Sequence, residues 1–510
     1  MQASTMFNRY REVLLTLSLA WVAGWLWFTW SYWEDDAYIH IEYARNVWLG
    51  RGFMFNGLIS NGDTSPVWVV LLVSALSTGL EWLTAGKALT ILCTAFSLWT
   101  LWHFTRSLCR DASVQADSLP GWMLALFVAS PYFCYWAFSG MEAVWAAGWL
   151  MLQSLLLMPG KPTTKTLLGA ALCVGLGPLI RPEMVLMFVA GGPFLLYQWW
   201  QVSRDMTPTK RWGLFLAAAI LLALPLLIWI GYALHAFGYV MPNTNAAKRA
   251  APDSSVIARL LNVFGLGFTG VLLVAGALLG SWVIPALKAS PSTRSEASRM
   301  LWGIPASAAP LLAWVLLTVV FYVVNHTYVQ TRYALVLAPG LMSLLWVLSL
   351  RRMNTRWLAA VTVLTLVVSL SGSLLMARPH LRNKMELISA IDGMVKRIES
   401  TVPTGSGIAV YSIGQYGFQL QHHPLIDIGG ITRPEASKYL FDADQHRMLD
   451  WAKKEGALYY ISGDAPEPGA VLLHEVNARV TGWHLRLSTY DITSAQRLWR
   501  LPAPGHLPQE

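Results

Sequence analysis

The sequence has little charge and little cysteine for its length. Only 13% of its 510 residues are charged, while 55% are hydrophobic, and soluble domains carry about 25% charged residues. This composition excludes an ordinary soluble protein. The four cysteines lie in or beside apolar runs, none of them after Cys173, and no C-x-x-C spacing occurs. Neither a disulfide framework nor a zinc site is therefore indicated.

Long apolar runs recur along most of the chain, and we predict a polytopic α-helical membrane protein with about eleven spans. A span needs roughly 20 apolar residues. The net charge of +9 comes from basic residues in short loops, which indicates membrane orientation rather than nucleic-acid binding. The runs are 13–33, 84–104, 119–138, 143–158, 166–180, 184–200, 213–234, 266–287, 302–324, 333–350 and 357–376.

The basic residues also set the predicted topology. Arg9 and Arg11 precede the first run, which lacks an A-x-A cleavage site, so we expect an uncleaved first helix with a cytoplasmic N-terminus. The loop 34–83 would then lie outside, with interfacial helices at 37–50 and 66–80. If 66–80 also spanned, every later basic loop would flip to the outside, and for that reason we reject it.

Two domains are predicted. Residues 1–377 form the transmembrane domain, in which an amphipathic helix is possible at 254–264. Residues 378–510 carry many acids and histidines and no run long enough to span, so we expect a small C-terminal α/β domain on the outer side. Its predicted helices are 383–400 and 434–454, and its predicted strands are 407–411, 424–428 and 457–461.

Polar residues gather on the predicted outer face, whereas the cytoplasmic loops hold mainly basic and small residues. A chain that collects carboxylates, amides and cations on one side of a membrane is expected to act there. The outer clusters are Asp35-Asp36, residues 139–142, residues 181–183, residues 241–249 and residues 326–332.

The acidic pair follows the first run directly. Neighbours on a helix point about 100° apart, so Asp35 and Asp36 cannot do the same job. One could act as the general base for an attacking hydroxyl while the other orients a partner or binds a sugar, as glycosyl transfer requires. The alternative, an interfacial acid cluster paired with Lys or Arg, fits the residues equally well.

The basic residues of these clusters suit phosphate binding. A guanidinium at Arg181 could bind phosphate, but a tight-turn ion pair with Glu183 across Pro182 is as good an interpretation. Lys248 and Arg332 are further phosphate candidates. Glu142 opens a helix, where the helix dipole alone would favour it.

Metal binding is not indicated by any motif. The adjacent His422 and His423 have the wrong spacing for one helix face, and we interpret them as structural. A divalent cation as cofactor is left open.

Taken together and in order, these motifs resemble the GT-C superfamily of membrane glycosyltransferases that use polyprenyl-phosphate sugars. Among them the chain is most similar to the arabinofuranosyltransferase group, with mycobacterial terminal β-(1→2) enzymes and a pilin-modifying enzyme. The resemblance lies in DDAYIHIEYARNVWLGRGFMFN, NGDTSPVW (usually EGYTSPLW), SGMEA, IRPE, GYVMPNTNAAK and YSIGQYGFQLQHHPLIDIGGITRPE. It covers nearly the whole chain. The departure at 61–63 puts Asp63 where an aromatic is usual.

The resemblance implies an inverting transfer of a sugar, such as the pentose arabinofuranose, from a polyprenyl phosphate to a periplasmic glycan, lipid or protein. The enzyme would sit in a bacterial inner membrane with its active site on the periplasmic side. Asp35 would be the general base, with Asp36 beside it. The other expected site residues are Arg181, Asn243, Lys248 and Arg332 for the donor phosphate, and Glu142, Glu183, Tyr43 and His326 for substrate.

Two rival functions are weighed. A transporter or flippase of lipid-linked sugars should hold charged residues near the bilayer midplane, but here the acids lie at the ends of apolar runs. A non-catalytic membrane scaffold would tolerate loss of Asp35, and it gives no reason for acids clustered on one side.

Overall fold

The computed structural model describes residues 11–158, 161–247, 300–301, 304–327, 329–351, 355–439, 445–478 and 495–502. The predicted span at 266–287 and the predicted amphipathic helix at 254–264 lie outside these residues, as does Lys248.

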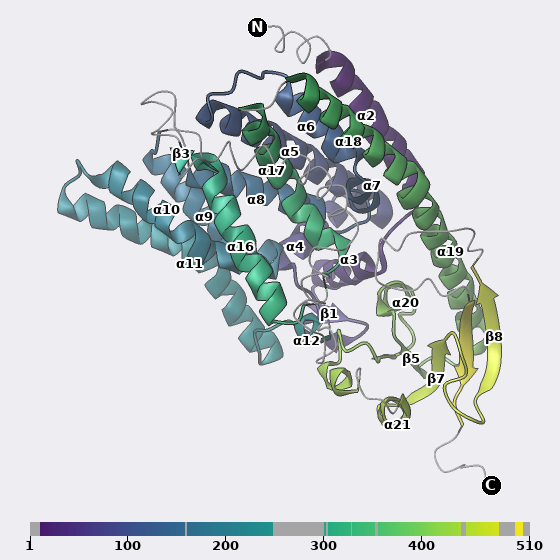
Figure 1. Cartoon of the computed structure of the whole chain (residues 1–510). Helices are drawn as coiled ribbons and strands as arrows, with labels where there is room; N and C mark the ends of the chain where they lie inside the picture. The colour runs from purple at the N-terminus through teal and green to yellow at the C-terminus, as the bar shows by residue number, and fades with distance from the viewer. Residues whose placement is uncertain are drawn as a thin grey trace.

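The described chain is mostly helical (Figure 1). The helices are α2 (Arg11–Phe28), α3 (Asp35–Trp48), α4 (Pro66–Leu76), α5 (Trp82–Asp111), α6 (Leu119–Ala129), α7 (Pro131–Trp136), α8 (Ala143–Leu157), α9 (Thr164–Ile180), η1 (Pro182–Val185), α10 (Leu186–Ser203), α11 (Pro208–Phe237), α12 (Thr244–Ala247), η2 (Ala306–Ala308), α16 (Ala309–Val324), α17 (Thr331–Leu350), α18 (Thr355–Gly372), η3 (Ser373–Ala377), α19 (Arg378–Thr401), α20 (Ile413–Gln419), η4 (Pro434–Lys438) and α21 (Gln445–Lys454). The strands are β1 (Met54–Phe55), β2 (Leu58–Ile59), β3 (Met300–Leu301), β4 (Ile304–Pro305), β5 (Gly407–Val410), β6 (Leu425–Asp427), β7 (Ala457–Ser462), β8 (Val471–Asn477) and β9 (Ala495–Arg500).

Five helical segments of the described chain are long and apolar enough to cross a membrane. They are Trp82–Asp111, Pro208–Phe237, Ala306–Val324, Thr331–Leu350 and Arg356–Thr401. Several shorter apolar helices, among them α2, α8 and α9, pack beside them. On the 30-residue helix α11, Leu214 and Ala233 are the buried residues, so most of its apolar surface faces outward, as contact with lipid requires. The chain is a multi-pass helical membrane protein, and the figure of about eleven spans stays a prediction.

Two helices differ from the predicted runs. The run expected at 119–138 is broken at Ser130, which ends α6 and caps α7 by accepting the N–H of Phe133 at 3.2 Å, with Pro131 at the first position of the new helix. A proline fits the first turn of a helix but not its interior. Helix α18 continues through a π-helical turn (η3) into α19. The predicted domain boundary at 377/378 therefore falls inside a helical segment.

The C-terminal residues contain a five-stranded sheet in the order β6-β5-β7-β9-β8. Strands β6, β5 and β7 run parallel, at the positions where the sequence predicts strands, while β9 and β8 add on antiparallel and were not predicted. In Figure 1, α19 reaches from the helical bundle down to this sheet. The short helix α20 follows β5 and packs on α3.

Helix α3 is held from the membrane side by buried contacts. The ammonium of Lys87, on α5, donates to the carbonyls of Thr29, Tyr32 and Phe138, which ties the end of α2 to the turn before α8. The indole of Trp33, directly before α3, fills the space over Gly140. A Cβ on Gly140 would lie 2.4 Å from that ring, and its φ of +88° also favours glycine. The first acidic residues therefore sit at a fixed place at the edge of the bundle.

Candidate active site

The two aspartates stand in the first turn of α3, where a helix N-terminus favours carboxylates. As predicted from the helical period, they point in different directions. The Asp36 carboxylate lies 2.7 Å from a guanidinium nitrogen of Arg332. The Asp35 carboxylate instead accepts the backbone N–H groups of Gln415 at 3.0 Å and Gly414 at 3.4 Å, both in α20.

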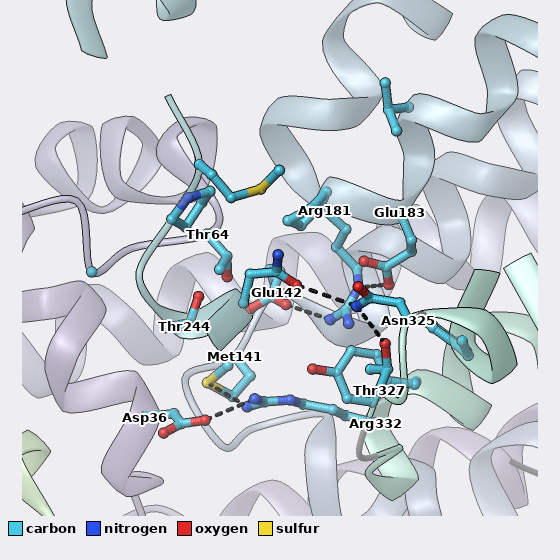
Figure 2. Close-up of a pocket in the computed structure, with 18 of the residues that line it drawn as sticks. Asp36, Thr64, Met141, Glu142, Arg181, Glu183, Thr244, Asn325, Thr327 and Arg332 are labelled. Atoms are coloured by element: carbon cyan, nitrogen blue, oxygen red, sulfur yellow. Dashed lines mark hydrogen bonds and ion pairs between the residues drawn. The ribbon is translucent and has the colours of Figure 1, made fainter. Parts of the chain in front are cut away.

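A cavity of about 470 Å³ opens beside α3 on the Asp36 side (Figure 2). Its wall combines α3, the loop before α4, the turn before α8, the segment from α9 to α10, the loop after α11, the α16–α17 connection and one residue of the C-terminal sheet region. The charged side chains that line it are those of Asp36, His40, Glu142, Arg181, Glu183 and Arg332. These residues come from four regions far apart in the sequence.

Arg181 holds one wall of the cavity. Its guanidinium lies 2.5 Å from Glu142 and 2.6 Å from Glu183, and it stacks over the ring of Tyr333 at 4.7 Å. The sequence folds this way because Pro182 ends α9 and starts a short 3-10 helix, which turns Glu183 back toward Arg181. The predicted tight-turn ion pair is therefore present, and Glu142 joins it.

Arg332 is the second arginine that lines the cavity. Besides Asp36, it contacts the rings of Trp136 and Tyr333, with its guanidinium 5.8 and 5.7 Å from their centroids. Only 4% of its side chain is exposed, against 16% for Asp36. A guanidinium held among aromatic rings keeps its charge and a fixed direction, so both cations of the cavity are oriented before any ligand binds.

His40 lies one turn after Asp36 on the same helix face. Its Nδ1 is 2.5 Å from Asp63, and its Nε2 is 3.6 Å from Glu142. Burial lowers the pKa of His40, but the carboxylates of Asp63, Glu142 and Asp36 outweigh this and raise it. The imidazole is consequently biased toward its charged form.

Asp35 has a different electrostatic setting. Its pKa is raised to about 6, mainly by burial. The N–H of Gln415 lowers this pKa, and the charges of Asp36 and Glu34 raise it. A carboxyl group with a pKa near neutrality is a better proton acceptor at neutral pH than one with its ordinary pKa.

The C-terminal residues close this region from the outside. Ile431, in the loop after β6, lines the cavity, and its carbonyl accepts an amide N–H of Asn243 at 3.1 Å. The Ser60 hydroxyl donates to the carbonyl of Thr432 at 2.9 Å. The loops at the carboxyl ends of β5 and β6 thus meet α3 and the cavity, the edge where parallel sheets usually place ligands.

The structure gathers some of the predicted site residues and separates others. Those that line the cavity are Asp36, Glu142, Arg181, Glu183 and Arg332. Those that are described but do not line it are Asp35, Tyr43, Asn243 and His326. Tyr43 instead donates to the carbonyl of Ser60 and accepts the N–H of Gly62, each at 3.1 Å, which shapes the loop before α4. Lys248 is outside the described residues.

Two polar residues of the site were missed by the sequence-based prediction. Neither His40 nor Asp63 is among the site residues that the sequence predicts. His40 nevertheless stands four residues after Asp36, the spacing that places two side chains on one helix face. For Asp63 the only signal was that it departs from the usual motif. Within the described residues, no group of three or more His, Cys, Asp or Glu side chains is placed to hold a metal ion.

The fold is similar to those of solved membrane proteins whose sequences differ widely from this one. ArnT from Cupriavidus metallidurans, in a crystal structure bound to undecaprenyl phosphate, matches 98% of this chain and all of its own, with 12% identity and a TM-score of 0.58. The oligosaccharyltransferase of Archaeoglobus fulgidus matches 89% of this chain and 70% of its own, with 11% identity and a TM-score of 0.50.

Other comparisons add less. The mycobacterial arabinofuranosyltransferase AftD matches 98% of this chain but 40% of its own, with 14% identity and a TM-score of 0.49, too slight a likeness to support the predicted subgroup. No family model and no curated protein matches the sequence.

Proposed function

We propose that this protein is an inverting glycosyltransferase that moves a sugar from a polyprenyl-phosphate donor to an acceptor hydroxyl. The observation that carries the proposal is the cavity that two oriented guanidinium groups, those of Arg181 and Arg332, line together with Asp36. ArnT, which shares the fold, was crystallised with undecaprenyl phosphate. A donor of the same kind suits a site at the edge of a membrane bundle.

The donor phosphate belongs with Arg332 in this scheme. A sugar phosphodiester carries one negative charge, and Arg332 is the cation next to the aspartate pair. Asp36 orients that guanidinium through their 2.7 Å ion pair, so it acts on the donor through Arg332. Arg181 is already paired with two carboxylates. It therefore serves mainly to hold Glu142 and Glu183 toward the sugar.

Asp35 is the general base in the proposed reaction. An acceptor oxygen attacks the anomeric carbon and the bond from that carbon to the phosphate oxygen breaks. Polyprenyl phosphate leaves, and the hydroxyl proton passes to Asp35. Its raised pKa suits the role, whereas the ion pair of Asp36 with Arg332 disfavours protonation of that carboxylate. Because Asp35 faces α20, the acceptor hydroxyl approaches α3 from the side of α20 in this scheme.

The finer assignments follow the sequence resemblance. The transferred sugar is a pentose such as arabinofuranose, and the acceptor is a periplasmic glycan, lipid or protein. The protein lies in a bacterial inner membrane, with the cavity and the C-terminal residues on the periplasmic side. Asn243 supports the donor site indirectly, because it ties the loop that lines the cavity to Ile431.

Sugar transfer in purified membranes from a panel of labelled polyprenyl-phosphate sugars tests the proposal. Wild type should transfer one sugar, and Asp35→Asn should be slower by about 10² to 10⁴, the usual contribution of a general base. Asp205→Asn, at a carboxylate whose side chain is 90% exposed far from the cavity, is the matched control. If wild type instead moves these lipids across vesicles without transferring sugar, the flippase function replaces this one.

A further inference from the structure

A fixed histidine faces the cavity from α3. Asp63 holds Nδ1 of His40 with one carboxylate oxygen at 2.5 Å, while its other oxygen accepts the N–H of Ser65 at 2.6 Å. Asp63 is thus fixed by its own loop, and the imidazole by Asp63. A carboxylate on Nδ1 sets the direction of the ring, so Nε2 of His40 points toward Glu142, which lies beside it in the same wall of the cavity.

The two oxygens of the Glu142 carboxylate differ in their hydrogen bonding. Its Oε1 takes the guanidinium of Arg181 at 2.5 Å. Its Oε2 is buried and makes no hydrogen bond to any residue that the structure describes, and Nε2 of His40 lies 3.6 Å away. That separation is too long for a hydrogen bond. Buried carboxylate oxygens rarely lack a donor because the unmet group is costly. A ligand hydroxyl on the cavity side of the pair can therefore contact both Nε2 of His40 and Oε2 of Glu142.

The chemistry of the two groups limits what fits there. The imidazolium can only donate, and the carboxylate can only accept. A hydroxyl does both, accepting from Nε2 and donating to Oε2. A phosphate or carboxylate oxygen would meet the negative charge of Glu142, and an ammonium group would meet the positive charge of His40. The position beside the pair therefore favours a neutral hydroxyl over an acidic or amino substituent.

We propose that His40, held by Asp63, and Glu142 bind one hydroxyl of the transferred sugar and so determine donor specificity. This inference rests on the proposed glycosyl transfer. It assigns the sugar to the wall formed by α3 and the start of α8, beside the phosphate at Arg332. The charged form of His40 that the site needs is favoured by Asp63, Glu142 and Asp36, the three carboxylates that act on it.

The alternative is a purely structural role, in which the His40–Asp63 contact holds α3 against the loop before α4. The two roles differ in what they do to donor analogues. A fastening contact affects all donors alike when it is removed, because it changes the position of the whole helix. A hydroxyl-binding contact affects the donors that carry that hydroxyl and spares the analogue that lacks it.

The test measures donor binding, so that it does not depend on transfer. Undecaprenyl-phosphate pentose and its single-deoxy analogues are titrated against the full-length protein, and Kd is compared between wild type, His40→Phe and Asp63→Asn. His40→Phe keeps a ring, and Asp63→Asn keeps the histidine but weakens its hold. His422→Gln, at an exposed histidine of the C-terminal region, is the control.

We expect wild type to bind one deoxy analogue about 10- to 100-fold more weakly than the full sugar, the range for hydrogen bonds to charged groups. His40→Phe should abolish that difference and leave the other analogues ranked as before, with Asp63→Asn intermediate. Uniform weakening of all donors, or equal binding of every analogue by wild type, overturns the proposal while leaving glycosyl transfer intact. Selective binding without transfer would uphold it and remove the proposed function, and absence of all donor binding would remove both.

Discussion

The two sides of helix α3 present adjacent carboxylates to opposite environments. On the cavity side, Asp36 lies 2.7 Å from a buried guanidinium. On the other side, Asp35 accepts backbone N–H groups of α20, and its pKa is raised to about 6. Identical side chains one residue apart thus meet a guanidinium on one face of the helix and backbone N–H groups on the other. The difference arises from what the rest of the fold places against each face.

The largest expected effect comes from removing the cation on the cavity side. Arg332→Gln leaves Asp36 without its ion-pair partner, and breaking a buried pair costs about 3–5 kcal/mol. The 16% exposure of Asp36 favours the lower end of that range. Thermal unfolding in detergent should show a clear loss of stability, and donor binding should weaken. Arg204→Gln, at an exposed pair, should change neither. An unaltered donor Kd would show that Arg332 does not hold the phosphate.

A smaller effect is expected on the α20 side. A Cβ on Gly414 would lie 1.9 Å from the carbonyl oxygen of Asp35, so Gly414→Ala must push α20 away from α3. Overpacking of this kind costs about 1–3 kcal/mol. The rate of transfer should change with the donor Kd preserved, because the displacement is on the acceptor side. An equal change in donor Kd would mean that a displacement on the α20 face of α3 also alters the donor site on its other face.

The same substitution should shift the pH dependence of transfer. A general base works when deprotonated, so activity should rise with pH through the pKa of Asp35, near 6 in wild type. The N–H of Gln415 lowers that pKa. Displacing α20 weakens that hydrogen bond, but it also exposes the carboxyl and so reduces burial, the largest cause of its raised pKa. The acid limb of the pH–rate profile should therefore move to lower pH in Gly414→Ala. An acid limb at the wild-type pH in Gly414→Ala would show that Asp35 does not determine the pH dependence of transfer.

Some of the site was predictable because local sequence determines it. Asp35 and Asp36 stand out as acids at a membrane exit, and the 100° step of a helix predicts that they diverge. Pro182 predicts the turn that pairs Arg181 with Glu183. Strands β5, β6 and β7 also form where short apolar segments predicted them.

The rest depends on contacts between distant segments. The N–H groups that reach Asp35 come from residues 379 and 380 positions later. Asp63, the partner of His40, lies in the loop before α4, 23 residues away. Neither contact has a periodic signal in the sequence. Strands β8 and β9 were missed, and their half-exposed burial patterns show why no buried run marked them. The break at Ser130 was readable from its serine–proline pair, which the long apolar run obscured.

The measurement that tests the division of labour most directly is single-turnover transfer from bound donor, with Asp35→Asn and Asp36→Asn compared side by side. We expect Asp35→Asn to bind the donor with the wild-type Kd and to transfer about 10² to 10⁴ more slowly. Asp36→Asn should bind the donor more weakly and transfer at a substantial rate once saturated. The reverse pattern, slow transfer in saturated Asp36→Asn and normal transfer in Asp35→Asn, would contradict the assignment of the base.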